Sequence, residues 1–241
     1  MELHLIGTGS IFTDRMSASA LVNGTILIDT PNGSVKAMRR AGIDPRAVDV
    51  CLITHFHADH FFDIIFLLME QGLLDRRDRE LVLLGPTGLA GRVEQLFELS
   101  YPGVWKTVRP NIKPRFVEFG ETGGEWSGGG HRIRALPVKH TTPIALGYSI
   151  EDARGVRLGY TGDTVHCPSV EELAATCSTL VLDISFLRER AGHMGLDDAE
   201  ALADRWPDLH LIGTHLGDEV TGSSRPNLTL PTDGQKFDVT G

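Results

Sequence analysis

Cysteine, positive charge and long apolar runs are all scarce in this sequence of 241 residues. The three cysteines, Cys51, Cys167 and Cys177, are far apart and form no C-x-x-C pair, so we expect neither a disulfide framework nor a thiolate zinc site, and we expect a cytoplasmic location. The N-terminus lacks the basic and long apolar segments of a signal peptide, so none is expected. The longest apolar tract, Phe61–Met69, contains Asp63 and is too short to cross a bilayer, so no membrane partner is expected.

Basic residues are outnumbered by acidic ones, 23 to 32, which gives a net charge of -9. This balance argues against a broad surface for nucleic acid or anionic membranes, although a local basic groove remains compatible with it. One modest basic and aromatic concentration, Lys106–Arg115, is interpreted as exposed loop charge, with contact to an anionic substrate as the alternative. The length and the 41% hydrophobic content predict one globular domain over residues 1–241.

Histidine, in contrast, is concentrated in one short stretch. Three imidazoles and one carboxylate fall within six residues there: His55, His57, Asp59 and His60. The apolar run Val48–Ile53 precedes them, and a strand that ends at Thr54 delivers the first two histidines to one side, because their spacing is i, i+2. A helix that begins at Ala58 then places the carboxylate and the last histidine in its first turn. These side chain types are ligands for divalent metals.

Further polar residues follow other predicted strands. His140, Asp163 and His215 each come directly after an apolar strand, as His55 does, so we expect several strand ends to converge on one edge. Asp29 also lies at a strand end, before a Pro-Asn-Gly turn, and is either a turn cap or a carboxylate that orients the metal histidines.

The remaining sequence predicts strands and helices that intermix without strict alternation, which suggests sheets sandwiched between helices. Asn23-Gly24 between two apolar runs predicts a hairpin. Gly120–Gly130 is interpreted as a flexible loop, and Asp75–Glu80, whose charges alternate in sign, as a solvated linker. The apolar residues after the histidines predict a buried packing helix over Phe61–Leu74.

The pattern H-x-H-x-D-H at residues 55–60 resembles the defining motif of the metallo-β-lactamase superfamily. The resemblance implies a four-layer αββα sandwich of the α/β (α+β) class, with two mixed sheets flanked by helices. It also implies two divalent metal ions, with zinc expected and manganese as the alternative. By this resemblance the first metal is held by His55, His57 and His140, and the second by Asp59, His60 and His215, with Asp163 as the bridge between them.

Within the superfamily the chain resembles the ribonuclease Z-like branch. Four segments carry this resemblance: Gly7-Thr8-Gly9-Ser10, Leu27-Ile28-Asp29-Thr30, Gly162-Asp163-Thr164 and Gly192-His193-Met194. The resemblance implies that His193 is the general acid that protonates the leaving oxygen. It further implies that His193 is oriented by Asp183, which stands where the branch has glutamate. The implied catalytic residues are Asp59, His193 and Asp183.

Ribonuclease Z carries a long basic arm for tRNA between the positions that match His140 and Asp163, and here these residues are only 23 positions apart. The resemblance therefore predicts a phosphodiesterase that acts on small-molecule or short phosphodiesters, with tRNA not expected. A carbonyl-directed hydrolase on the same site (thioesterase, lactonase or β-lactamase) and a non-catalytic metal-dependent binding protein remain alternatives. Homodimers are frequent in that branch, so a homodimer also remains open.

Overall fold

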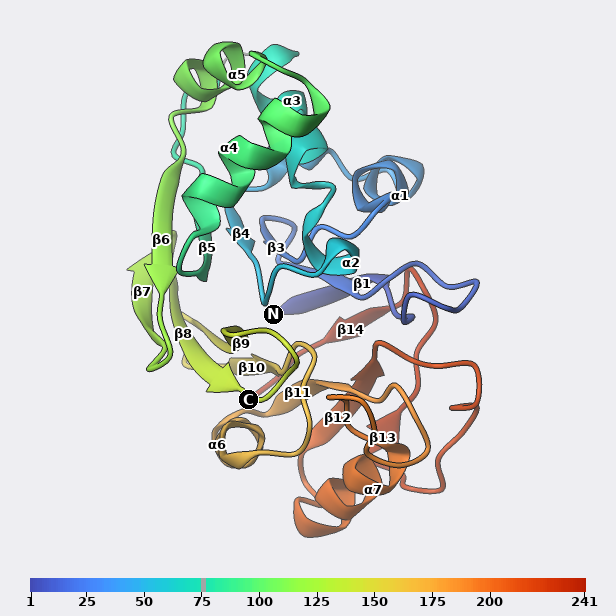
Figure 1. Cartoon of the computed structure of the whole chain (residues 1–241). Coiled ribbons are helices and arrows are strands. Elements are labelled where there is room, and N and C mark those ends of the chain that lie inside the picture. Colours follow the sequence, from blue (N-terminus) through green and yellow to red (C-terminus); the bar gives the residue numbers. More distant parts are fainter. Residues whose placement is uncertain (75–76) are drawn as a thin grey trace.

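The chain folds into two seven-stranded sheets that pack face to face, with helices on both outer faces, within residues 1–74 and 77–241, which the computed structural model describes (Figure 1). This is the αββα sandwich of two mixed sheets that the sequence predicts. No helix in these described ranges combines the length and apolar character that a bilayer span requires.

The first sheet contains, in spatial order, β14 (Lys236–Asp238), β1 (Glu2–Gly7), β2 (Ser19–Val22), β3 (Ile26–Ile28), β4 (Val50–Leu52), β5 (Val82–Pro86) and β6 (Arg115–Phe119). The second contains β13 (Leu228–Thr229), β12 (His210–Thr214), β11 (Thr179–Asp183), β10 (Arg157–Tyr160), β9 (Ala145–Asp152), β8 (His131–Val138) and β7 (Gly124–Gly128). Strands β3 to β6 are parallel neighbours, as are β10 to β13, so the carboxyl ends of each parallel set meet at one edge of its sheet.

The helices form two separate outer layers. Those beside the first sheet are α1 (Ser34–Arg40), η1 (Pro45–Ala47), α2 (Ala58–Phe61), α3 (Ile64–Leu73), α4 (Leu89–Ser100) and α5 (Trp105–Ile112), and those beside the second are α6 (Pro168–Thr176) and α7 (Leu196–Arg205). Figure 1 shows α3, α4 and α5 at one end of the molecule and α6 and α7 at the other, with both sheets between them.

Alternation along the strands divides the apolar residues into three layers. In β4, Val50 and Leu52 pack in the cluster between the sheets, whereas Cys51 packs with α3 and α4 on the other side. Side chains of successive strand residues point to opposite faces, so a strand that is covered on both faces must be apolar throughout, as β4 is. A third cluster, which includes Leu180 and Leu182 of β11, fills the space beneath α6 and α7.

The predicted hairpin and the strand-to-helix turn are both confirmed. Asn23 and Gly24 adopt positive φ values of 51° and 72° between the antiparallel strands β2 and β3, as a tight hairpin turn requires. The short helix α2 begins at Ala58, so Asp59 and His60 lie in its first turn.

Two loop predictions are wrong. The segment Lys106–Arg115 is mostly helix α5, because Trp105, Val108 and Ile112 form a buried face that packs beside α3. The segment Gly120–Gly130 contains strand β7, which pairs with β8 and buries Trp126 in the core between the sheets. In both segments a few spaced apolar side chains decide the structure, although basic residues or glycines surround them.

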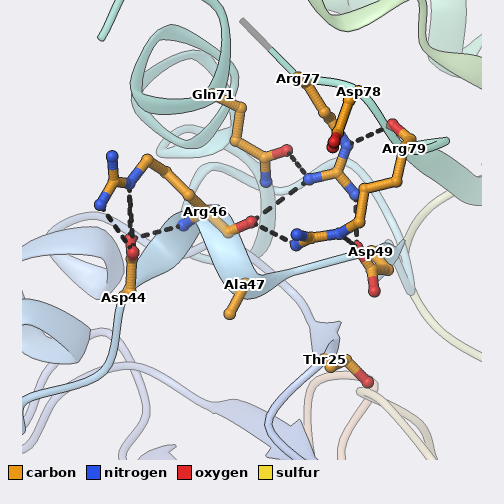
Figure 2. A pocket seen from close by; sticks show the side chains of 9 residues that line it. All are labelled: Thr25, Asp44, Arg46, Ala47, Asp49, Gln71, Arg77, Asp78 and Arg79. Carbon is orange, nitrogen blue, oxygen red and sulfur yellow. Dashed lines mark hydrogen bonds and ion pairs between the residues drawn. The ribbon is translucent and has the colours of Figure 1, made fainter. Parts of the chain in front are cut away.

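The predicted solvated linker Asp75–Glu80 lies partly outside the described residues, and for Arg77 the prediction is wrong. The Arg77 side chain is only 4% exposed and donates hydrogen bonds to Asp49 Oδ1 at 2.5 Å and Gln71 Oε1 at 2.7 Å (Figure 2). Arg79 donates to the same Asp49 oxygen at 2.6 Å. A cavity of about 640 Å³ adjoins this cluster, but both guanidinium groups are already engaged by the Asp49 carboxylate and by the carbonyl of Arg46, so their role is to attach residues 77–79 to η1.

Tyr148 connects the two sheets beside the histidine cluster, because its buried hydroxyl donates a 2.7 Å hydrogen bond to the carbonyl of Ile53. We predict that Tyr148→Phe lowers the free energy of unfolding by about 1–3 kcal/mol, since the buried carbonyl loses its partner. Urea denaturation measures this change. The matched control is Tyr160→Phe, because Tyr160 is equally buried but its hydroxyl lies near the Thr214 side chain and makes no hydrogen bond to a backbone carbonyl of the first sheet. Equal losses in both variants would contradict the prediction.

Candidate metal centre

The histidines and carboxylates predicted as ligands meet at the carboxyl ends of strands from both sheets. Three of them form a first triad, since His55 Nε2 lies 3.0 Å from His57 Nδ1, which lies 3.2 Å from His140 Nε2. His55 and His57 follow β4, and His140 follows β8. Nitrogens that share a tetrahedral zinc ion at 2.0–2.1 Å lie roughly 3.4 Å apart, so this spacing suits three ligands of one cation.

A second triad lies beside the first and consists of Asp59, His60 and His215. Asp59 Oδ2 lies 3.7 Å from His60 Nε2 and 3.5 Å from His215 Nε2. His215 follows β12 and adopts a φ of 54°, which non-glycine residues rarely adopt. Such strained backbone tends to occur where a side chain must be aimed at a functional site.

Asp163 lies between the two triads at the end of β10. Its Oδ2 is 3.8 Å from His55 Nε2 and 3.9 Å from His140 Nε2 in the first triad. The same oxygen is 3.2 Å from the Nε2 of His60 and 3.3 Å from that of His215 in the second triad. One carboxylate oxygen therefore lies within 3.9 Å of ring nitrogens from both triads.

The donor set fits metal ions because some of its nitrogens are buried without other partners. His60 Nε2 and His215 Nε2 have no hydrogen bond of acceptable geometry to any described residue, although the Asp163 oxygen is close to both. A buried polar atom that is left unpaired costs free energy, so these two nitrogens suit metal ligands.

A buried carboxylate on the first sheet fixes the orientation of two of these histidines. Asp29 Oδ2 accepts a 2.8 Å hydrogen bond from His60 Nδ1 and another from the Thr54 hydroxyl, also at 2.8 Å. The Thr54 hydroxyl in turn lies 3.0 Å from His55 Nδ1. With each Nδ1–H donated in this way, both Nε2 atoms are left as ligands. Asp29 thus occupies the orienting position that was one of its two sequence interpretations.

Asp183 on the second sheet has a matching arrangement. Its Oδ2 accepts a 2.8 Å hydrogen bond from His193 Nδ1, and its Oδ1 accepts a 2.6 Å bond from the Ser185 hydroxyl. The Ser185 hydroxyl lies 2.7 Å from His215 Nδ1, so Asp183 acts directly on His193 and through Ser185 on His215. Neither Thr54 nor Ser185 was predicted as a site residue, because a serine or threonine near a strand end carries no distinctive spacing.

Burial and the buried carboxylates shift the pKa values of the site histidines in opposite directions. Burial would lower the pKa of His60, but Asp163 and Asp29 raise it well above its ordinary value. Burial holds the pKa of His55 well below its ordinary value and also lowers the pKa of His140, which favours the neutral imidazoles that metals bind. Burial opposes the charged form of His193, but the hydrogen bond to Asp183 and the negative charges of Asp183 and Asp163 together outweigh burial and raise the His193 pKa. Burial would raise the pKa of Asp163, yet the facing histidines His215 and His60 hold it well below its usual range.

A cavity of about 480 Å³ opens over this centre. Its lining includes site residues from both triads, the Asp163 carboxylate and His193, together with Ile11, Phe12 and Phe186. The centre is therefore accessible from solvent on one side, while His55 and His60 are fully buried beneath it.

A family model described as a beta-lactamase superfamily domain matches residues 24–216, which are most of the chain and contain both triads. The chain belongs to the metallo-β-lactamase superfamily. In this superfamily protein, the H-x-H-x-D-H motif lies at the strand-to-helix turn between β4 and α2, with the remaining candidate ligands on the facing sheet.

The relatives of this metallo-β-lactamase superfamily protein include enzymes named ribonuclease Z. This chain is 35% identical to the ribonuclease Z of Agathobacter rectalis over 138 residues, which cover 56% of this chain and 42% of the relative. It is 31% identical to that of Mycobacterium sp. strain KMS over 194 residues, which cover 75% of this chain and 67% of the relative. The crystal structure of the short form of human tRNase Z has the same fold, with a TM-score of 0.81, 18% identity and full coverage of both chains. The chain is thus a metal-dependent hydrolase of this superfamily.

We predict that Ser185→Ala weakens metal binding by about 10- to 100-fold, the usual effect of removing a residue that orients a metal-binding histidine. Competition with a chelating dye measures the affinity, and the affinity of the second triad should fall most. The matched control is Ser149→Ala, because Ser149 is equally buried in the second sheet and its hydroxyl contacts only Cys177 Sγ, at 3.7 Å, among the described residues. Unchanged affinity in Ser185→Ala would show that Asp183 does not act on His215.

Proposed function

We propose that the chain is a dinuclear metal-dependent phosphodiesterase of the ribonuclease Z-like group, with zinc as the metal and manganese as the alternative. The main support is the position of Asp163 Oδ2, within 3.9 Å of ring nitrogens in both triads. A carboxylate in this position suits two cations that share one ligand. In such two-metal sites the bound ions supply a hydroxide nucleophile at neutral pH and stabilise the charge that develops on phosphorus oxygens.

In this proposal the two triads hold the metals as the resemblance implies. His55, His57 and His140 bind the first ion, whereas Asp59, His60 and His215 bind the second. Asp59 is half-buried and lines the cavity, so its carboxylate is also placed to accept a proton from the water that attacks the substrate. The buried carboxylates Asp29 and Asp183 keep the histidines in the tautomer that metals bind.

His193 acts as the general acid. Its Nδ1 is held by Asp183, so Nε2 is the atom that donates a proton to the leaving oxygen. The hydrogen bond and the negative charge of Asp183 raise the pKa of His193 in spite of its burial, which favours the protonated ring that a general acid needs. A leaving alkoxide needs such a proton more than the leaving thiolate of a thioester does. The His193–Asp183 pair therefore favours a phosphodiesterase over a thioesterase and over a non-catalytic binding protein.

The substrate in this proposal is a small or short phosphodiester. The segment between His140 and Asp163 consists mainly of β9 and β10, which pair antiparallel within the second sheet, so no arm projects from it to grip tRNA. The acidic net charge also disfavours a long polyanion. Because relatives of this chain are named ribonuclease Z, a short RNA end is also among the proposed substrates.

Asp163→Asn tests the dinuclear site. We expect the wild-type protein to bind two metal ions per chain and the variant to bind fewer. We also expect turnover of bis(p-nitrophenyl) phosphate to fall on the order of 10²-fold, because the metals lose their shared negative ligand. Elemental analysis and steady-state kinetics provide the two measurements. Asp208→Asn, which removes an exposed carboxylate outside the cavity and outside both triads, serves as the control and should resemble wild type. Full activity in Asp163→Asn would refute the proposal.

His193→Ala tests the general acid through the leaving group. We expect kcat to fall about 10²- to 10⁴-fold on a 2′,3′-cyclic nucleotide, whose alkoxide leaving group needs a proton. The loss should be much smaller on bis(p-nitrophenyl) phosphate, since p-nitrophenolate leaves without one. His166→Ala, which removes a half-exposed histidine paired with Glu171 outside the cavity, should change neither rate. An equal loss on both substrates, at unchanged metal content, would exclude the acid role.

A further inference from the structure

The loop between β1 and β2 places two apolar side chains at the mouth of the metal-centre cavity. Ile11 is 53% exposed and Phe12 is 88% exposed, and both line the cavity together with Phe186. An exposed phenylalanine side chain lacks much of the stabilisation that burial gives. A group of such apolar side chains beside a candidate metal centre therefore requires an explanation. We call Ile11 and Phe12 the apolar rim.

The backbone of this loop is fixed by residues from the C-terminal part of the chain. Asp233 accepts hydrogen bonds from the Thr8 backbone and hydroxyl through Oδ1, at 2.9 and 2.7 Å, and from the Met16 backbone through Oδ2, at 2.7 Å. Arg15 donates to the Thr8 hydroxyl at 3.0 Å and to the carbonyl of Pro231 at 2.8 Å. Both ends of the loop are therefore anchored, which keeps the apolar rim beside the metal centre.

The loop is also closed tightly on itself. A Cβ added at Gly9 would lie 2.4 Å from the Arg15 Cβ and 2.5 Å from the Thr13 hydroxyl oxygen, so only glycine permits this close approach. The one cation of the loop, Arg15, is occupied by the anchoring contacts and is absent from the cavity lining.

The charge around the cavity limits the kind of substrate it accepts. Asp218 and Glu219 line the side formed by the loop after β12, and among the described residues the lining contains no lysine or arginine. A substrate with several phosphates would place its additional charges beside these carboxylates rather than at the metal centre. Arg190, which stacks on the Phe186 ring at 5.2 Å, is itself absent from the lining. A singly charged diester with a flat apolar group would place its charge at the metal centre and the flat group against the apolar rim.

We propose that the apolar rim is a subsite for an aromatic group esterified to the substrate phosphate, which makes the preferred substrate a monoanionic aryl or nucleoside phosphodiester. This inference rests on the proposed function and specifies its substrate class. Stacking of a planar ring on Phe12 supplies the affinity, and Ile11 and Phe186 provide further apolar contact.

The test separates binding from turnover by using phosphonates that are not cleaved. Isothermal titration of the metal-loaded protein compares phenylphosphonate with methylphosphonate, and we expect wild type to prefer the phenyl compound about tenfold. Phe12→Ala should reduce this preference to about twofold and leave the methylphosphonate affinity unchanged, whereas Phe12→Leu should keep an intermediate preference. In kinetics with bis(p-nitrophenyl) phosphate, Phe12→Ala should raise KM about tenfold and leave kcat and metal content unchanged.

Leu99→Ala is the matched control, because Leu99 is 84% exposed on α4, outside the cavity. This substitution should change neither the phenylphosphonate nor the methylphosphonate affinity. A phenyl preference that survives in Phe12→Ala, or that is absent from wild type, overturns the subsite even if diesters are hydrolysed. A preference that depends on Phe12 supports the subsite, and the absence of diester turnover in the same protein would then count against the proposed function alone. Adenosine 5′-phosphonate and phenylphosphonate, compared in the same titration, distinguish a nucleoside from a simple aryl group as the occupant.

Discussion

Two fully buried carboxylates, Asp29 and Asp183, hold the histidines on which the rest of the site depends. Burying an ionised carboxylate costs several kcal/mol, and here each one is offset by at least three hydrogen bonds. The two arrangements are alike, because each carboxylate contacts one histidine directly and a second one through a hydroxyl group, Thr54 in one case and Ser185 in the other. One arrangement belongs to each sheet. The site therefore has two similar supports that face each other across the sandwich.

The sandwich brings the two supports together because the parallel strands of each sheet end at the same edge. His55 follows a strand of the first sheet, whereas Asp163 and His215 follow strands of the second. Apolar packing between the sheets sets the distance between these strand ends, and rigid close packing of that kind transmits small errors of position. A defect in the core between the sheets would therefore alter the spacing of the ligands without touching any of them.

Much of this centre was predictable from the sequence, since a ligand cluster and strand-end polar residues are local signals. The order of the ligands along the chain, the helix start at Ala58 and the hairpin at Asn23-Gly24 are all such signals. Helix α5 was missed because its basic residues obscured the spacing of Trp105, Val108 and Ile112, and strand β7 because glycines surround Trp126. Thr54, Ser185 and the apolar rim could not be found in this way, because hydrogen-bond partners and exposure depend on which distant segments the fold brings together.

The anchoring of the loop that carries Phe12 links the C-terminal part of the chain to the cavity. Strand β14 pairs with β1 at the edge of the first sheet, and Asp233, which precedes it, holds the loop. Strand pairing at the edge of a sheet is among the first structure to open locally. Thr8 and Ser10 of the same loop also form backbone hydrogen bonds with Leu216, the residue after His215. The backbone that supports the apolar rim is therefore continuous with the backbone of the second triad. A change at this edge of the sheet, in evolution or by engineering, would reach the metal ligands as well as the side chains that meet the substrate.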